Sequence, residues 1–450
     1  MKKVIFALGV LLVFACSKTS TTTTQSSQPS ISTPVIVTPT PNIVYSVKML
    51  DSFSAINKTT SWYLTNKAFS GNFYVDKSKF WGFEEVISNN VSTYIPYNEG
   101  TSFSYSASKT YYFQGNGLHL YSDLDGDGKK DLFAPYNRYP QMQLIPNILM
   151  YSNYELNENS YNLEFGLKGA RKLALSDFDK DGINEIMIFS SGFDFAPFPG
   201  DSLGIYSVKN KKMRYLTDDI GYFHGGAVGD INNDGLPDIL GYSGGSVVIP
   251  IHPMSYINNG NFNFTLQKNI FQGFTSGSND NFYSVELMDL NKDGKLDLVL
   301  AGNGIGIVIP QTNGIYNRAN AISLPVKSNQ FPNSLNFLDL NGDGNLDIIS
   351  GYTVNYNNYG VAIYIYTNGQ YVEKTSDYVD KSDFPGPVNA QLPSDWIMWY
   401  YLYDKDGDGA LDIVGDGVQG SGLTNSASQP MKEIWWKNVS GKFIYTVKNL

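Results

Sequence analysis

The feature that most constrains this chain is a nine-residue pattern that recurs six times. Its copies begin at Asp123, Asp177, Asp230, Asp289, Asp339 and Asp404, at spacings of 54, 53, 59, 50 and 65 residues. Each copy has an acidic or amide side chain at positions 1, 3 and 5, glycine at position 6 and a carboxylate at position 9. Six copies at near-regular spacing indicate a chain built from structural repeats.

These residue types match the ligands of calcium. The ion takes about six to eight oxygens at about 2.3–2.6 Å, so alternate side chains can converge on it while position 7 supplies a backbone carbonyl and position 9 closes the shell. The expected ligands are Asp123, Asp125, Asp127, Lys129 and Asp131 in loop one, Asp177, Asp179, Asp181, Ile183 and Glu185 in loop two, and Asp230, Asn232, Asp234, Leu236 and Asp238 in loop three. In loops four to six they are Asp289, Asn291, Asp293, Lys295 and Asp297, then Asp339, Asn341, Asp343, Asn345 and Asp347, then Asp404, Asp406, Asp408, Ala410 and Asp412.

Glycine at position 6 is expected to let the chain turn sharply around the ion. The six glycines are Gly128, Gly182, Gly235, Gly294, Gly344 and Gly409. Glycine reaches left-handed backbone conformations without steric cost. A β-branched residue at any of these positions should open its loop.

The distribution of charge also calls for bound cations. Four acidic residues lie in each of loops one, two and six and three in each of the others, so 21 of the 42 Asp and Glu residues fall in the loops. Like charges this close repel unless a cation lies among them. Six Ca²⁺ ions would nearly cancel the net charge of −10. Asparagine at position 3 of loops three, four and five lowers the charge of the ligands in those loops. We expect structural ions that stay bound to the protein. A calcium sensor is the alternative.

The EF-hand loop begins with a similar pattern but requires a glutamate at position 12 and flanking helices. Position 12 is here Ala134, Ile188, Gly241, Leu300, Ser350 and Gly415. The flanking segments are rich in residues that favour strands, such as 282–288 and 298–300. We therefore expect these loops to connect β-strands.

Each loop is followed by the same order of strand-like segments. In the fifth unit, residues 348–350 follow the loop, 361–366 form an apolar run, Asn368-Gly369 predicts a turn, and 370–373 close the unit. Four strands in about 50 residues are the content of one propeller blade. The loops, their spacing and the trailing turn resemble FG-GAP/VCBS repeats, the blades of integrin-α-like propellers. That resemblance implies an all-β propeller with calcium ligands at positions 1, 3, 5 and 9 and the backbone of position 7.

Residues 117–450 are expected to form six blades with calcium loops. Residues 44–116 lack the loop but contain strand-like stretches rich in aromatics. Seven blades are the commoner closure in the resembling family, so we expect a seven-bladed propeller with 44–116 as a degenerate first blade. Six blades with an N-terminal elaboration are the alternative.

The N-terminus resembles that of a bacterial lipoprotein. Lys2 and Lys3 precede the apolar run of residues 4–15, which is too short to span a bilayer, and Cys16 follows. Residues 1–15 are expected to be a signal peptide and Cys16 the lipidated residue; an ordinary secretory signal is the alternative. Residues 16–43, rich in Ser, Thr, Gln and Pro, predict a disordered tether. Ser17 gives no acidic retention signal, which favours the outer membrane and the cell surface.

The sequence says less about the ligand of such a propeller than about its fold. The net charge of −10 argues against a nucleic-acid partner. We favour a binding or adhesion module for a glycan or a protein, because aromatic side chains are abundant and could stack on sugars. The aromatic candidates are Trp396, Trp399, Tyr400, Tyr401, Trp435 and Trp436, although adjacent strand residues face opposite ways and at least one of the last two should pack between blades.

Two other functions are open. A polysaccharide lyase or hydrolase is one, but His119, His224 and His252 show no catalytic spacing and no nucleophile, zinc or phosphate motif is present in the sequence. Of these histidines, His224 is the one to mutate first. The other is a structural scaffold without a small-molecule site. No catalytic residue is expected, and the oligomeric state is not predicted.

Cys16→Ser tests the lipid anchor. The variant should lose its lipid and move from the membrane fraction to the soluble fraction, because the remaining sequence contains no second apolar run long enough to cross a bilayer. Fractionation with detergent partitioning measures this. Retention of Cys16→Ser in the membrane fraction would refute the anchor.

Overall fold

The structure is a computed structural model that describes residues 69–70, 80–88, 91–99, 109–112, 118–122, 124–128, 131–135, 147–151, 161–164, 169–192, 200–244, 252–274, 281–354, 358–384, 396–403, 405–406, 408–416 and 432–449. The chain divides into two compact units, Met1–Pro41 and Asn42–Leu450. All described residues belong to the second unit. Cys16, the expected signal peptide and the expected tether lie outside them.

Strands dominate the described residues, which confirms the expected all-β class. The helical segments among them are the 3₁₀ turn η3 (Arg318–Asn320) and the short α2 (Thr375–Tyr378). Within this part of the chain, no helix has the length and apolar character needed to cross a membrane.

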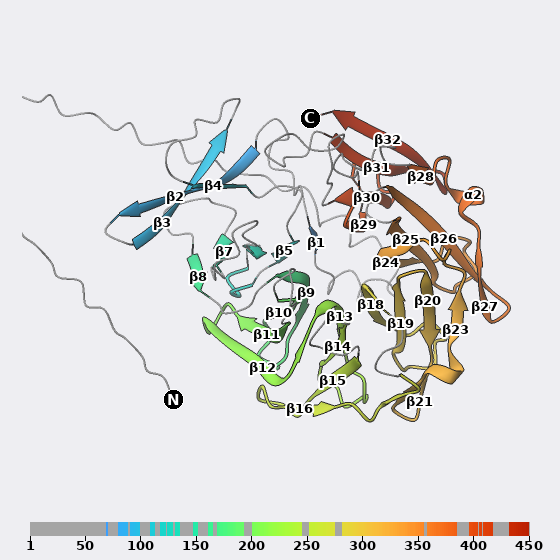
Figure 1. The fold of residues 1–450 in the computed structure, drawn as a ribbon, viewed down its shortest axis with the longest axis horizontal. Helices are drawn as coiled ribbons and strands as arrows, with labels where there is room; N and C mark the ends of the chain where they lie inside the picture. The colour runs from blue at the N-terminus through green and yellow to red at the C-terminus, as the bar shows by residue number, and fades with distance from the viewer. Residues whose placement is uncertain are drawn as a thin grey trace, which may run out of the picture. The chain divides into compact units, whose positions relative to one another are not determined.

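The strands form six sheets that each contain one of the nine-residue loops (Figure 1). The first contains β1 (Phe69–Ser70), β5 (Leu118–Ser122), β6 (Asp131–Pro135), β7 (Asn147–Tyr151) and β8 (Tyr161–Glu164), and the second β9 (Ala170–Ser176), β10 (Glu185–Ser190), β11 (Asp201–Ser207) and β12 (Lys212–Gly221). The third contains β13 (Phe223–Gly229), β14 (Asp238–Ser243), β15 (His252–Asn258) and β16 (Phe264–Gln267). We number these sheets, and the three below, by their loops.

The later sheets follow the same plan. Sheet four contains β18 (Ser284–Met288), β19 (Asp297–Gly302), β20 (Ile305–Ile309) and β23 (Ile322–Leu324), sheet five β24 (Phe331–Leu338), β25 (Asp347–Thr353), β26 (Tyr359–Thr367), β27 (Gln370–Glu373) and β28 (Asp383–Phe384), and sheet six β29 (Trp399–Tyr403), β30 (Asp412–Asp416), β31 (Lys432–Val439) and β32 (Lys442–Asn449). A small accessory sheet comprises β17 (Phe271–Gln272), β21 (Gln311–Thr312) and β22 (Ile315–Asn317). Within residues 44–116, β2 (Phe80–Ser88), β3 (Val91–Glu99) and β4 (Lys109–Tyr112) form a three-stranded sheet, while β1 pairs with β5 of sheet one.

Each nine-residue loop joins two paired strands, as expected; we call them the first and second strands of the sheet, which in sheet one are β5 and β6. Position 9 opens the second strand and pairs with the residue just before position 1. The pairs are Ser122 with Asp131, Ser176 with Glu185, Gly229 with Asp238, Met288 with Asp297, Leu338 with Asp347 and Tyr403 with Asp412. One antiparallel register therefore closes all six loops.

Apolar side chains fill the space between successive sheets. Five buried clusters lie at the five junctions from sheets one and two to sheets five and six. The first strand of each sheet also contacts the first strand of the next, from β5 to β29. Because each middle sheet is covered on both faces, strands such as β25 and β26 are buried along nearly their whole length rather than alternating.

The loop backbone needs left-handed conformations at two positions. Position 6 has φ between +82° and +90° in all six glycines. Position 4 is also left-handed, with φ of +62° at Lys180, +59° at Asn233 and +61° at Lys292. A Cβ added to Gly182 would meet no atom within 4 Å, so glycine is required there by the backbone angle and not by crowding.

Gly182→Val is expected to lower the free energy of unfolding by at least about 1–2 kcal/mol, because a side chain with a positive φ clashes with its own backbone and β-branching worsens the clash. Lys180→Gly is the matched control in the same loop, since it relieves a left-handed non-glycine residue at φ +62°. Denaturant unfolding of both variants measures the difference. Equal stability of Gly182→Val and wild type would contradict the backbone requirement.

Candidate metal centre

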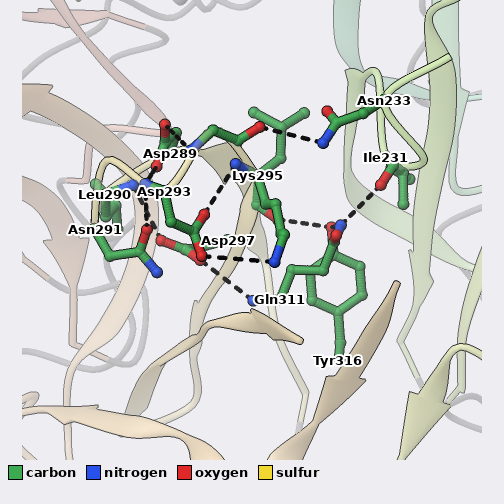
Figure 2. Close-up of polar contacts among 12 residues, drawn as sticks. Ile231, Asn233, Asp289, Leu290, Asn291, Asp293, Lys295, Asp297, Gln311 and Tyr316 are labelled. Atoms are coloured by element: carbon green, nitrogen blue, oxygen red, sulfur yellow. Dashed lines mark hydrogen bonds and ion pairs between the residues drawn. The ribbon is translucent and has the colours of Figure 1, made fainter. Parts of the chain in front are cut away.

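Loop four shows how the nine-residue pattern folds (Figure 2). Asp289 accepts the backbone N–H groups of Asp293 (3.1 Å) and Gly294 (3.0 Å), one on each carboxylate oxygen. The amide oxygen of Asn291 accepts the same Asp293 N–H (2.9 Å). Asp293 in turn accepts the N–H of Lys295 (2.9 Å). The side chains at positions 1, 3 and 5 are thus held by the loop's own backbone.

The same bonds recur in the other loops whose side chains are fully described. The position 6 glycine N–H donates to position 1 at 2.9 Å in Asp177, 2.7 Å in Asp230 and 2.8 Å in Asp339. The position 7 N–H donates to position 5 at 2.9 Å in Asp181, 2.8 Å in Asp234 and 2.8 Å in Asp343. In loop five, the second oxygen of Asp339 accepts the N–H of Gly342 (2.7 Å) rather than that of position 5.

Loops one and six are described in part and agree with this pattern. Asp125 accepts the N–H of Asp127 (3.1 Å), and Asp408 accepts that of Ala410 (2.9 Å). Asp123, Lys129 and Asp404 lie outside the described residues. Asp131 is placed at the start of β6, but its side chain is not described.

The carboxylate at position 9 is buried and braces the loop. Its exposed fraction is 1% in Glu185 and Asp297 and 0% in Asp238, Asp347 and Asp412. One oxygen accepts the N–H of position 2, at 2.9 Å in Glu185, 2.8 Å in Asp238, 3.0 Å in Asp297, 2.8 Å in Asp347 and 3.0 Å in Asp412. In the four aspartates the other oxygen accepts a backbone N–H from a later strand, at 2.8 Å from Asn258, 3.3 Å from Gln311, 2.9 Å from Tyr366 and 2.7 Å from Asn438.

Burial shifts the acidity of these carboxyls. It raises the pKa of Asp238, Asp297, Asp347 and Asp412 to about 6, against the lowering effect of the backbone N–H groups. It raises the pKa of Glu185 to about 8, with the neighbouring carboxylates of the same loop adding to the shift. A cation beside these groups would favour their charged forms.

Loop two brings three carboxylates close enough to share one ion. Oxygens of Asp177, Asp179 and Glu185 all lie within 4.8 Å of one another. Two oxygens on opposite sides of a calcium ion are separated by about 4.6–5.2 Å, which is twice its usual bond length. The donor set therefore fits calcium in charge, chemistry and spacing. Within the described residues no other loop forms such a group of carboxylates, since position 3 is asparagine in loops three to five.

Lysine side chains already lie on loop carboxylates. In loop six, the Lys437 ammonium contacts Asp406 and lies 3.0 Å from Asp408. In loop two, Lys209 lies 2.9 Å from Asp181 and, by hydrogen bonding, lowers the pKa of that carboxyl. Positive charge is thus drawn to positions 3 and 5, where acidic groups crowd.

A pocket of about 490 Å³ lies beside loop five. Leu340, Ile365, Lys374, Asp377, Tyr378, Ser440, Gly441 and Lys442 line it. Lys374, the residue before α2, lies 3.6 Å from Asp377 in that helix, and Lys442 begins β32 after the β31–β32 turn. The pocket therefore offers two ammonium groups, a carboxylate, hydroxyls and an aromatic ring to a polar ligand.

Three of the six aromatic candidates for ligand contact are buried inside the protein. Tyr400 and Trp436 are 0% exposed and Tyr401 is 3% exposed. The Trp436 indole N–H donates to the backbone carbonyl of Lys381 (2.7 Å), which confirms that one residue of the Trp435–Trp436 pair packs between sheets. Trp399 is half-buried against the apolar cluster of sheets one and two.

The two histidines with described side chains lie in separate contacts. The His224 ring lies against Tyr222 and Tyr283, at centroid distances of 4.6 and 4.9 Å. His252 Nε2 lies 3.0 Å from Asp219. His119 is in β5 and its side chain is not described.

Sequence reasoning missed the residues that connect one loop to the next. Asn258 and Gln311 hydrogen-bond to residues 80 positions earlier, in the loop of the preceding sheet. Their amide side chains at or just beyond the end of a third strand are the only sequence signal, and it is weak.

Comparison with solved structures finds proteins of low sequence identity. A lectin from Agrocybe aegerita, described by its recognition of non-reducing terminal N-acetylglucosamine, is 17% identical, with 74% of this chain and 80% of that chain covered and a TM-score of 0.40. The Aleuria aurantia lectin, a six-bladed β-propeller with fucose recognition, is 10% identical, with 72% and 91% covered and a TM-score of 0.37. The V. cholerae biofilm matrix protein Bap1 is 14% identical, with 74% and 60% covered and a TM-score of 0.33.

Family comparison identifies the repeats. The FG-GAP-like repeat matches residues 230–300 and 339–415, the two stretches that contain loops three and four and loops five and six. No curated protein matches the sequence. The resemblance to FG-GAP repeats is thereby confirmed, and the chain carries FG-GAP-like repeats at residues 230–300 and 339–415.

Proposed function

We propose that this protein is a calcium-stabilised β-propeller that acts as a binding module at the cell surface. The observation that carries the proposal is the close approach of Asp177, Asp179 and Glu185, whose oxygens lie within 4.8 Å of one another in a loop held by its own backbone. Such an arrangement of like charges is repulsive without a cation and matches the coordination distances of calcium.

The contacts between sheets support a closed ring. The first strands of sheets one to six contact one another in chain order. Trp399, in the first strand of sheet six, packs against the cluster that includes Leu124 and Leu173 of sheets one and two. This contact favours six blades, with β2, β3 and β4 as an N-terminal elaboration, over the seven-bladed ring expected from the sequence.

About six calcium ions would serve a structural role in this proposal. Positions 1, 3 and 5 would hold the ion with side-chain oxygens, position 7 with its carbonyl and position 9 with its buried carboxylate. The ion would supply the positive charge that offsets the crowded acids, and the chain contains no disulfide to hold these loops, since Cys16 is its only cysteine.

Asp343→Ala should reduce the number of bound calcium ions by one and destabilise sheet five. Asp343 takes the backbone N–H of Asn345 (2.8 Å), which lowers the pKa of its carboxyl and keeps it charged. Metal analysis of the purified protein measures the stoichiometry. Asp218→Ala, which removes an exposed acid outside the loops, is the control. Unchanged calcium content in Asp343→Ala would contradict the loop assignment.

The proposed ligand is a glycan or a protein, with the pocket beside loop five as the candidate contact surface. Lys374 and Lys442 bring two positive charges to this pocket, although the chain has a net charge of −10. Tyr378 offers an aromatic ring that could stack on a sugar. The protein would present this surface from a membrane to which it is anchored through lipidated Cys16. A polysaccharide lyase or hydrolase on the same propeller and a scaffold without ligand remain the alternatives.

A glycan screen with turnover assays separates these functions. Saturable binding without turnover, weakened at least about tenfold in the double variant Lys374→Ala/Lys442→Ala, is the expected result, because charged hydrogen bonds contribute about 1.5–3 kcal/mol each. Lys448→Ala, an exposed lysine of β32 outside the pocket, should bind as wild type does. New reducing or unsaturated ends would identify an enzyme, and neither binding nor turnover would favour the scaffold.

A further inference from the structure

Gln311 joins the loops of two neighbouring sheets (Figure 2). Its backbone N–H donates to Asp297, the position 9 carboxylate of loop four (3.3 Å). Its side-chain amide donates to the backbone carbonyl of Ile231, position 2 of loop three (2.8 Å). The Gln311 side chain is 5% exposed, and its amide nitrogen also lies 3.2 Å from the hydroxyl of Tyr316. That hydroxyl donates to the carbonyl of Leu296 at position 8 of loop four (2.8 Å).

Asn258 makes the same connection one sheet earlier. Its backbone N–H donates to Asp238, the position 9 carboxylate of loop three (2.8 Å). Its side-chain amide donates to the carbonyl of Phe178, position 2 of loop two (2.9 Å). The Phe178 N–H in turn donates to Glu185 at position 9 of loop two. A line of buried hydrogen bonds therefore runs from loop two through loop three to loop four.

A second contact joins loops three and four at the surface. The side-chain amide of Asn233, position 4 of loop three, donates to the carbonyl of Gly294, position 6 of loop four (3.3 Å). Asn233 is exposed and has φ +59°. Its replacement by glycine would remove the bond without straining the backbone.

Sheets five and six lack the connection among the described contacts. Tyr366 and Asn438 give their backbone N–H to position 9 as Asn258 and Gln311 do. Tyr366 has no amide side chain. The side-chain oxygen of Asn438 accepts the N–H of Gly441 (2.9 Å), as that of Asn258 accepts the N–H of Gly260 (2.9 Å), but no described contact joins the Asn438 amide nitrogen to loop five. The two loops at the C-terminal end therefore serve as an internal comparison.

We infer that Asn258 and Gln311 are positioning residues that couple the calcium sites of loops two, three and four. The inference rests on the proposed function. An ion that fixes position 9 of one loop also fixes the strand end that holds position 2 of the preceding loop. The neighbouring loop then loses less conformational freedom when it binds its own ion, which is positive cooperativity. Loops five and six bind independently of this group.

The test is a calcium titration of the full-length protein in detergent after removal of metal with a chelator. The wild-type titration should contain a cooperative phase with a Hill coefficient above 1. Gln311→Met keeps the length of the side chain but removes the amide, so it should abolish that cooperativity and raise the calcium midpoint about fivefold, the lower end of usual coupling. The total number of bound ions should not change. Gln311→Asn, which keeps an amide as in Asn258, should restore part of the cooperativity.

Two further variants separate coupling from general destabilisation. Asn438→Leu should lower the unfolding temperature and leave the Hill coefficient at its wild-type value, because the hydrogen bonds of Asn438 to other described residues lie within its own hairpin and loop. Asn233→Gly, which alters only an exposed contact, should reduce cooperativity even if Gln311→Met fails to fold. Calcium binding with unchanged steepness in Gln311→Met and Asn233→Gly would overturn the coupling alone. Absence of bound calcium in wild type would overturn the proposed function as well.

Discussion

One buried carboxylate in each of sheets two to six holds the repeated unit together. At position 9 it opens the second strand, pairs with the residue before the loop, and accepts the N–H of position 2. In the four described aspartates a second bond reaches a later strand. A charged group buried this deeply is stable only with hydrogen bonds or a counter-ion, so the loop must fold back over it. The turn at glycine and the inward side chains at positions 1, 3 and 5 follow from that closure.

The loops and the apolar junctions between sheets contribute differently to the stability of the fold. Five clusters of Leu, Ile, Val and aromatic side chains hold each sheet against the next, and this burial is the main favourable contribution to folding. The loops lie at the end of the first strand and concentrate negative charge, which opposes folding. A bound cation would change this repulsion into an attraction within each loop. The hydrogen bonds donated by the side-chain amides of Asn258 and Gln311 would then extend this stabilisation from one sheet to the next.

The sequence predicted the local unit better than its connections. The nine-residue pattern correctly predicted strand–loop–strand connections, the turn at position 6 and the absence of EF-hand helices, because these depend on neighbours within one loop. It left open whether Tyr400 and Tyr401 contact a ligand or pack inside the protein, where the structure places them, since burial depends on which sheet covers each face. It also missed Gln311, whose partner Ile231 lies 80 residues away. Long-range hydrogen bonds leave no periodic signal in the chain.

Thermal unfolding with excess calcium and with a chelator, together with metal analysis of the same protein, tests the central claim most directly. The account predicts about six bound ions and a large fall in the unfolding temperature on chelation, because calcium that binds only the folded state stabilises it by mass action. A protein without bound metal, whose unfolding temperature is the same in calcium and in chelator, would contradict it.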